Sequence, residues 1–171
     1  VLNFPPDEIE RLRREMPESL RVVPSLGVYY LAINLRKPQF ADSRARLALS
    51  LAIDREGLTE KLLRTGVKPA FAFVGTNFTN YDGVQLSEEA LPFPARQVEA
   101  RRLLAAAGFG PGKPLTFEYV YDTNEENRKI AVALSAMWQA VGVKARPANV
   151  GQQERPSMTA RYPGSPAETR R

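Results

Sequence analysis

The residues best suited to chemistry lie in the stretch FADSRARLALSLAIDREGLTEKLL, residues 40–63, where charged side chains interrupt an apolar run. Arg44 and Arg46 closely follow Asp42, a spacing that allows either ion pairs or the recognition of a phosphate or carboxylate. Positive charge in the first turns of a helix is unfavourable beside the helix dipole, so these arginines need partners. We interpret them as structural residues paired with Asp42, Asp54 or nearby carbonyls, and we keep anion recognition as the alternative.

A second group suited to chemistry is the acidic cluster of Asp122, Glu125 and Glu126. Paired carboxylates can perform general acid–base catalysis, and carboxylate oxygens bind hard cations such as Ca²⁺. The helix dipole also favours acids in the first turn of a helix, and the ligand spacing of a calcium loop is absent. We therefore interpret the cluster as a helix start, and we predict no catalytic residue, no metal site and no cofactor.

The segment GFGPGKP, residues 108–114, places glycines before a lysine, as a phosphate-binding loop does. Such a loop needs Ser or Thr after the lysine and a glycine five residues before its second glycine. This chain has Pro114 and Ala107 at those positions. The segment is better explained as a helix stop followed by a turn.

The composition excludes several classes of function. The 171 residues contain no cysteine and no histidine, which removes disulfides, thiol catalysis, the commonest metal ligands and the commonest general base. The net charge of +5 is spread among acids, as in DEIERLRRE at residues 7–15, which argues against a nucleic-acid partner. No apolar run approaches the roughly 18 residues of a membrane span, and residues 1–16 lack a signal-peptide pattern. We expect no direct membrane insertion.

The first half of the chain alternates strand and helix patterns. Prolines and acids near the start favour a short helix that ends near Pro17. The stretch SLRVVPSLGVYYLAINL predicts two strands broken at Pro24, the second from about Val28 to Leu35. Asp42 and Asp54 are predicted to cap two successive helices that are joined almost without a loop.

The second half begins after Gly66, which we expect to be the C′ residue of the second helix. Residues 67–93 are rich in turn residues, and residues 94–107 form an amphipathic helix pattern. A strand is predicted at residues 115–121, followed by a long helix with the capping box Thr123 and Glu126, and by a final strand that Pro147 interrupts.

These residues resemble the oligopeptide-binding branch of extracytoplasmic solute-binding proteins, the peptide/nickel class that serves ABC importers. The resemblance rests on YYLAINLRKPQFADSRARLALSLAIDREGL, residues 29–58, and on the stretch ARRLLAAAGFG to AVGVK, residues 100–144. It implies a periplasmic-binding-protein-like fold of class II, the peptide-binding class, with a mixed sheet and packed helices. It also implies that Arg44 and Arg46 have a structural role in the fold.

Family members of this kind have about three times this length and close two lobes over a peptide. The resemblance therefore implies that residues 1–150 are part of the C-terminal lobe, and that residues 151–171 are a disordered or non-family tail. It implies substrate binding for uptake, with a peptide or other small solute and the importer permease as partners, in the periplasm. The alternatives are a truncated interaction fragment without a small-molecule ligand of its own and, more remotely, a carboxylate-based enzyme; we predict no enzyme.

Alternation divides the predicted strand at residues 28–35 into two faces. The more apolar face, which we expect to face the core, carries Tyr29, Leu31 and Ile33. The other face, which we expect to face the ligand, carries Tyr30, Ala32 and Asn34. Small Ala32 would leave room for a side-chain pocket, and Tyr30 would supply a flat wall with a hydroxyl group.

Overall fold

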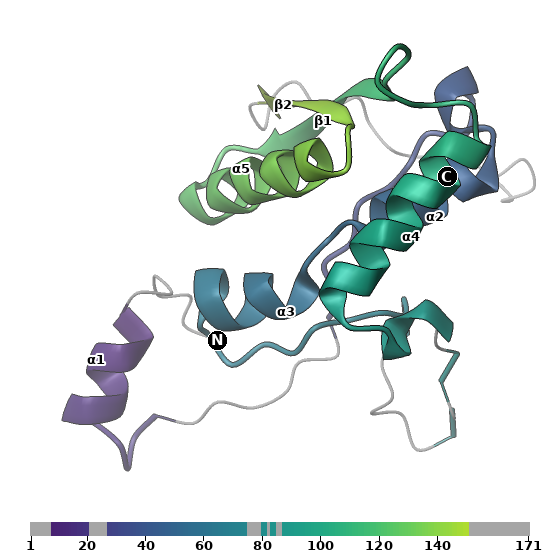
Figure 1. Ribbon diagram of the computed structural model, residues 1–171. Helices are drawn as coiled ribbons and strands as arrows, with labels where there is room; N and C mark the ends of the chain where they lie inside the picture. Colours follow the sequence, from purple (N-terminus) through teal and green to yellow (C-terminus); the bar gives the residue numbers. More distant parts are fainter. Residues whose placement is uncertain (1–7, 21–26, 75–79, 82, 85–86, 151–171) are drawn as a thin grey trace, which may run out of the picture.

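A computed structural model describes residues 8–20, 27–74, 80–81, 83–84 and 87–150 (Figure 1). The expected tail, residues 151–171, lies outside these described residues. So does most of the first predicted strand, which precedes Pro24. Among the described residues, no helix is both long enough and apolar enough to cross a membrane.

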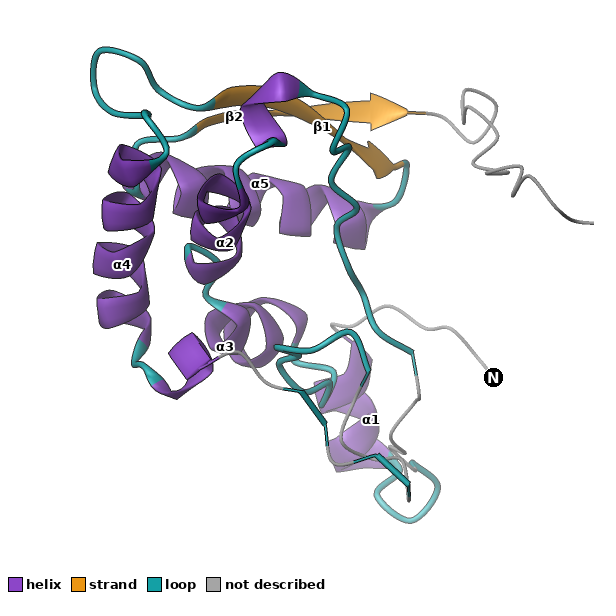
Figure 2. Ribbon diagram, turned by 90° about the vertical axis from the view of Figure 1, so that its right-hand side faces the viewer, coloured by secondary structure: helices purple, strands orange, loops and turns teal. Residues whose placement is uncertain are grey.

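A βαβ unit forms the centre of the structure. The strands β1 (Thr116–Asp122) and β2 (Lys144–Val150) pair in parallel, and α5 (Glu125–Ala140) connects them and lies along one face of the sheet (Figure 2). Parallel strands need such a crossover connection. The predicted strand, long helix and final strand are therefore confirmed. The described sheet has these two strands only, so it is parallel where we expected a mixed sheet.

Two local predictions in this unit are wrong. Pro147 does not interrupt β2 but pairs in register with Tyr119. The strand tolerates a proline because β2 has a single neighbour in the described sheet, so a missing N–H group can lie on the unpaired side. Asn124, not Thr123, caps α5, since its side chain accepts the backbone N–H of Asn127 at 2.6 Å.

Two successive helical segments precede this unit, as predicted. Asp42 caps α2 (Ser43–Leu51), and Asp54 caps the next segment by accepting the backbone N–H of Gly57 at 2.9 Å. This second segment starts as α3 (Arg55–Gly57) and continues as the π-helical η2 (Leu58–Leu63). It ends earlier than expected, because Arg64 adopts the left-handed conformation (φ 55°) two residues before Gly66.

The remaining helices pack around these elements or connect them. The amphipathic helix α4 (Phe93–Ala106) packs against α2 and stops at Gly108, whose φ of 83° favours glycine. Beyond it, the backbones of Gly110 and Lys113 bond to each other, which confirms a turn where a phosphate loop was considered. The shorter helices are α1 (Glu8–Glu15), η1 (Pro38–Phe40) and η3 (Ser87–Ala90).

One apolar core joins α2, α4, α5 and the inner face of the sheet. It includes Ala48, Leu49, Leu103, Leu104, Leu115, Leu134, Trp138 and Val143. Phe117 of β1 stacks edge-on against both Phe40 and Trp138, at ring-centroid distances of 5.2 and 5.3 Å. This core positions the segment that leads into η1.

The predicted strand at residues 28–35 is not a strand in the structure. Residues 28–34 run as an extended segment that belongs to no strand among the described residues, and a turn begins at Leu35. The β-branched and aromatic composition favours extended backbone, but a strand also needs a neighbour to receive its hydrogen bonds.

Candidate functional site

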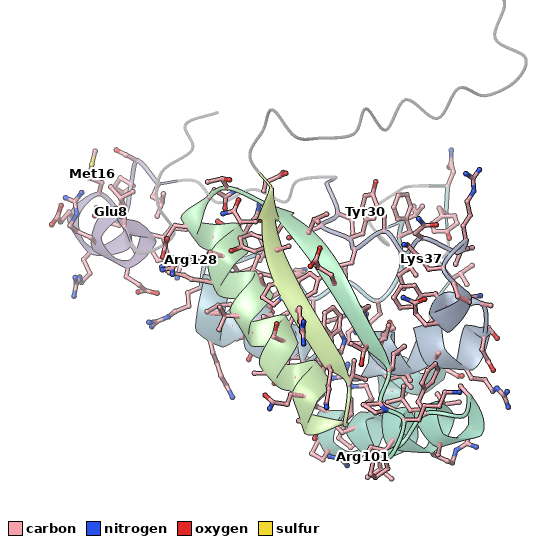
Figure 3. The ribbon with its side chains drawn as sticks, turned by 90° about the horizontal axis from the view of Figure 1, so that it is seen from above. Glu8, Met16, Tyr30, Lys37, Arg101 and Arg128 are labelled. Carbon is pink, nitrogen blue, oxygen red and sulfur yellow. The ribbon has the colours of Figure 1, made fainter. Side chains whose placement is uncertain are left out.

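The three predicted ligand-side residues lie on the extended segment and are all exposed. Tyr30 is labelled in Figure 3. Tyr30 is 61% exposed, and Ala32 and Asn34 are also open to solvent. The expectation for the opposite face is only partly correct. Ile33 packs against the core, whereas Tyr29 is 60% exposed and Leu31 is also exposed. An unpaired segment is free to turn, so strict alternation of its side chains is lost.

Tyr30 forms an aromatic pair with Phe73, a residue of the turn-rich loop. The two ring centroids are 5.1 Å apart and the ring planes are inclined by 70°. Phe73 is 66% exposed, so both rings present apolar faces to solvent. Exposed aromatic rings that are already in contact form a surface suited to a ligand side chain.

Asn34 has a local role in the backbone. Its side-chain oxygen accepts the backbone N–H of Arg36 at 3.0 Å, and its carbonyl oxygen accepts the N–H of Lys37 at 3.1 Å. An asparagine that accepts a backbone N–H two residues on forms an Asx-turn. Asn34 therefore turns the chain from the extended segment into η1, and Tyr30 and Ala32 remain the better candidates for ligand contact.

Tyr29 lies close to the carboxyl end of β1 and the start of α5. Partial burial of the ring, together with the nearby carboxylates of Asp122 and Glu126, raises the pKa of its phenol. Glu125 of the same acidic cluster forms an ion pair with Arg128 at 2.8 Å, and the Arg128 hydrogen bond lowers its pKa. These contacts support the interpretation of the cluster as a helix start. Within the described part of the chain, no group of three or more potential metal ligands is present.

Tyr119 of β1 packs against the core of the fold. Tyr119 packs edge-on against Trp138 at 5.2 Å, and its hydroxyl group donates to the carbonyl oxygen of Ala131 and contacts Ser135 Oγ. Burial raises the pKa of Tyr119. Tyr119 is therefore a core residue and not a candidate for ligand contact.

Arg44 and Arg46 have structural roles, as predicted. The guanidinium of Arg44 pairs with Asp42 at 2.6 Å, and the hydrogen bonds from Arg44 lower the pKa of Asp42. Arg46 donates to the carbonyl oxygens of Phe40 and Ala41 at 2.7 and 2.9 Å. Arg46 therefore satisfies carbonyls at the turn between η1 and α2, and this turn fixes where the extended segment enters the core.

Sequence reasoning missed Arg96, which is 1% exposed on α4. Its Nη2 donates to both carboxylate oxygens of Glu56, at 2.7 and 2.6 Å. The signal was present in the sequence, because Arg96 lies four residues before Ala100 and seven before Leu103, on the buried face of the helix. The contacts of Phe73 had no such signal, since the loop lacks periodicity.

Comparison with known proteins gives a consistent result. Residues 1–164 match the family model described as "Bacterial extracellular solute-binding proteins, family 5 Middle". This match extends past Val150, where we expected the resemblance to end. The chain is 42% identical over 142 residues to the periplasmic murein peptide-binding protein MppA of Escherichia coli K12. It is 32% identical over 169 residues to the periplasmic oligopeptide-binding protein OppA of the same strain.

The solved structures of such proteins superpose well on the described fold. The E. coli murein tripeptide-binding protein MppA matches with a TM-score of 0.81 and 38% identity, over 88% of this chain and 30% of that chain. Haemophilus influenzae OppA in complex with the peptide RPPGFSPFR matches with a TM-score of 0.78 and 31% identity, over 86% and 30%. In sequence, the matches cover 80% of this chain and 26% of MppA, and 95% and 30% of OppA. The chain thus spans less than a third of the length of these relatives.

Proposed function

Because the chain belongs to the bacterial extracellular solute-binding proteins of family 5, we propose that it supplies part of the peptide-binding lobe of a longer protein for ABC-transporter-mediated uptake. Its fold is α/β and corresponds to part of a lobe of the periplasmic-binding-protein-like fold, as the resemblance implied. MppA and OppA, the relatives that it matches, are named as peptide-binding proteins.

The observation that carries the proposal is the exposed Tyr30–Phe73 pair beside Ala32. The pair offers a flat apolar wall, and the small Ala32 side chain leaves space two residues along the same segment. A peptide side chain fits such a place, because binding sites combine apolar surface with a few polar groups. The Tyr30 hydroxyl group is the polar group at this wall.

The extended segment offers a second means of recognition. Between Val28 and Ile33, the backbone has no partner strand among the described residues. Peptides bind well to exposed extended backbone, because main-chain hydrogen bonds give affinity that does not depend on the peptide sequence. This combination suits a protein that binds many peptides through the backbone and selects a few side chains by pockets.

The longer protein would act outside the cytoplasm and deliver its solute to the permease of an ABC importer. Its ligand is a peptide or another small solute, and no chemical step on the ligand is required. Closure of two lobes over the ligand would exclude water from both sides of the peptide. This chain would supply one side of the closed site.

Thermal unfolding of the longer protein tests this proposal against an interaction fragment without a small-molecule ligand. A ligand that binds only the folded state raises the melting temperature. At a ligand concentration one hundred times Kd, it increases the free energy of unfolding by about 2.7 kcal/mol. We expect a rise with RPPGFSPFR or with a mixture of di- to pentapeptides. The isolated 171-residue chain should bind these peptides weakly or not at all, since one side of the site is absent. No shift of the longer protein with any peptide would favour the interaction fragment.

A further inference from the structure

Two arginines from different helices hold one phenylalanine of the turn-rich loop. The guanidinium carbons of Arg55, at the start of α3, and of Arg96, on α4, each lie 5.0 Å from the centroid of the Phe71 ring. Cations at this distance from an aromatic ring are attracted by its quadrupole, and the attraction grows when water is excluded. Phe71 is therefore fixed at two points by elements that belong to the core of the fold.

The side chain of Arg96 is held in place beside the Phe71 ring. It is 1% exposed, Glu56 holds it through Nη2, and its guanidinium also lies 5.5 Å from the centroid of Phe93. Its Nε and Nη1 have no hydrogen-bond partner among the described residues. The buried guanidinium therefore contacts two aromatic rings in addition to its one carboxylate partner.

The loop that carries Phe71 has few other fixed points. Residues 67–74 contain no helix or strand, and within the described residues no backbone hydrogen bond joins them to another element. Phe73 follows Phe71 by two residues, and its ring meets Tyr30. The position of Phe71 therefore limits where Phe73 can lie. In this way it also affects the contact between Phe73 and Tyr30.

We propose that Arg96 is a positioning residue that acts through Phe71 to place Phe73 against Tyr30. The importance of that pair for ligand binding depends on the proposed function, but the placement itself does not. The buried guanidinium of Arg96, paired with the partly exposed Glu56, would then set the geometry of an exposed wall without contact with any ligand. Glu56 completes the chain of contacts, because it holds the guanidinium that holds the ring.

Nuclear magnetic resonance of the 171-residue chain tests the placement without a ligand. Nuclear Overhauser cross-peaks between the rings of Tyr30 and Phe73 report their contact, and those between Phe117 and Trp138 report the intact core. In Phe71→Leu we expect loss of the first set and retention of the second. A role in stability alone would lower the melting temperature and leave both sets of cross-peaks in place.

Phe93→Leu is the matched control, because Phe93 also contacts Arg96 but does not belong to the loop. It should keep the Tyr30–Phe73 cross-peaks. Retention of these cross-peaks in Phe71→Leu, their loss in both variants, or their absence from the unmodified chain would each overturn the proposal. Since none of these results involves a peptide, they are distinct from a failure of the proposed function.

Arg96→Lys separates the planar guanidinium from the charge, because lysine can still pair with Glu56 but has no flat face to stack on the ring. We expect weaker Tyr30–Phe73 cross-peaks than in the unmodified chain but not the complete loss expected for Phe71→Leu, because Arg55 still contacts the Phe71 ring. Unchanged contact in a variant that keeps the Phe117–Trp138 cross-peaks would overturn the role of Arg96. If Arg96→Lys loses the core cross-peaks as well, Glu56→Gln decides the role of Arg96, because it weakens the hold on the guanidinium without removing it. Unchanged Tyr30–Phe73 contact in Glu56→Gln would then overturn that role.

Discussion

Trp138 of α5 donates its indole N–H to the carbonyl oxygen of Leu49 in α2 at 3.0 Å, in the buried core. The last carbonyls of a helix have no partner within the helix. Here the backbone N–H of Ile53 turns to Ser50, so the Leu49 carbonyl has to be satisfied by a side chain. One hydrogen bond thus joins the two helices and completes the C-terminal end of α2.

Trp138→Phe should therefore lower the free energy of unfolding by more than the smaller ring alone would explain. It leaves the buried Leu49 carbonyl without a donor, which costs about 1–3 kcal/mol. Urea denaturation measures this loss, and Gln139→Ala at the exposed neighbouring position is the control. Equal stability of Trp138→Phe and the control would show that water or another group satisfies the carbonyl.

Gly57→Ala should destabilise the chain although alanine is the better helix former, by about 1 kcal/mol in helix propensity. A Cβ at this position would lie 2.8 Å from Cγ of Asp54, whose carboxylate caps the segment. The added methyl group and the cap therefore compete for one place. The double variant Asp54→Ala/Gly57→Ala should recover part of the propensity gain, so the two changes should be non-additive in thermal unfolding. Additive effects would contradict this account.

The ion pair between Glu56 and Arg96 predicts loss of stability in acid. Partial burial acts to raise the pKa of Glu56, but the hydrogen bonds from Arg96, a backbone N–H and the nearby arginine charges together lower it. A lowered pKa in the folded state contributes stability above the ordinary glutamate pKa of about 4.3. This contribution is lost as the pH falls through the folded-state value.

Glu56→Gln removes this titration. The difference in unfolding free energy between wild type and Glu56→Gln should be constant above about pH 5 and shrink at lower pH. Glu60→Gln, at an exposed position of η2, is the control. A difference that does not depend on pH between 3 and 6 would show that Glu56 does not sense the charge of Arg96.

Sequence patterns were sufficient to predict features that depend only on residues close together in the chain. Asp42 and Asp54 cap their helices as predicted, because a cap needs only the residues beside it. Gly108 stops α4 for the same reason. The errors at Thr123 and Gly66 are shifts of one or two residues between neighbouring candidates, where geometry alone decides which residue serves.

Features that depend on distant partners could not be predicted in this way. The extended segment has a strand composition, but its pairing depends on a neighbour that the described residues do not provide. Arg96, Phe71 and Glu56 come from three segments, and only the fold brings them together. The Tyr30–Phe73 contact also depends on the fold, so the sequence pattern identified Tyr30 as a candidate and did not identify Phe73.

We expect the face of the extended segment that carries Tyr30 and Ala32 to contact the ligand. Calorimetric titration of the longer protein with RPPGFSPFR, or with the peptide that gives the largest thermal shift, measures this directly. Ala32→Trp fills the proposed pocket and should weaken binding at least about tenfold, or 1.4 kcal/mol, with an unchanged melting temperature. Ala136→Trp, at an exposed position of α5, should leave the affinity unchanged. Unchanged affinity of a well-folded Ala32→Trp would show that this face of the segment does not contact the ligand.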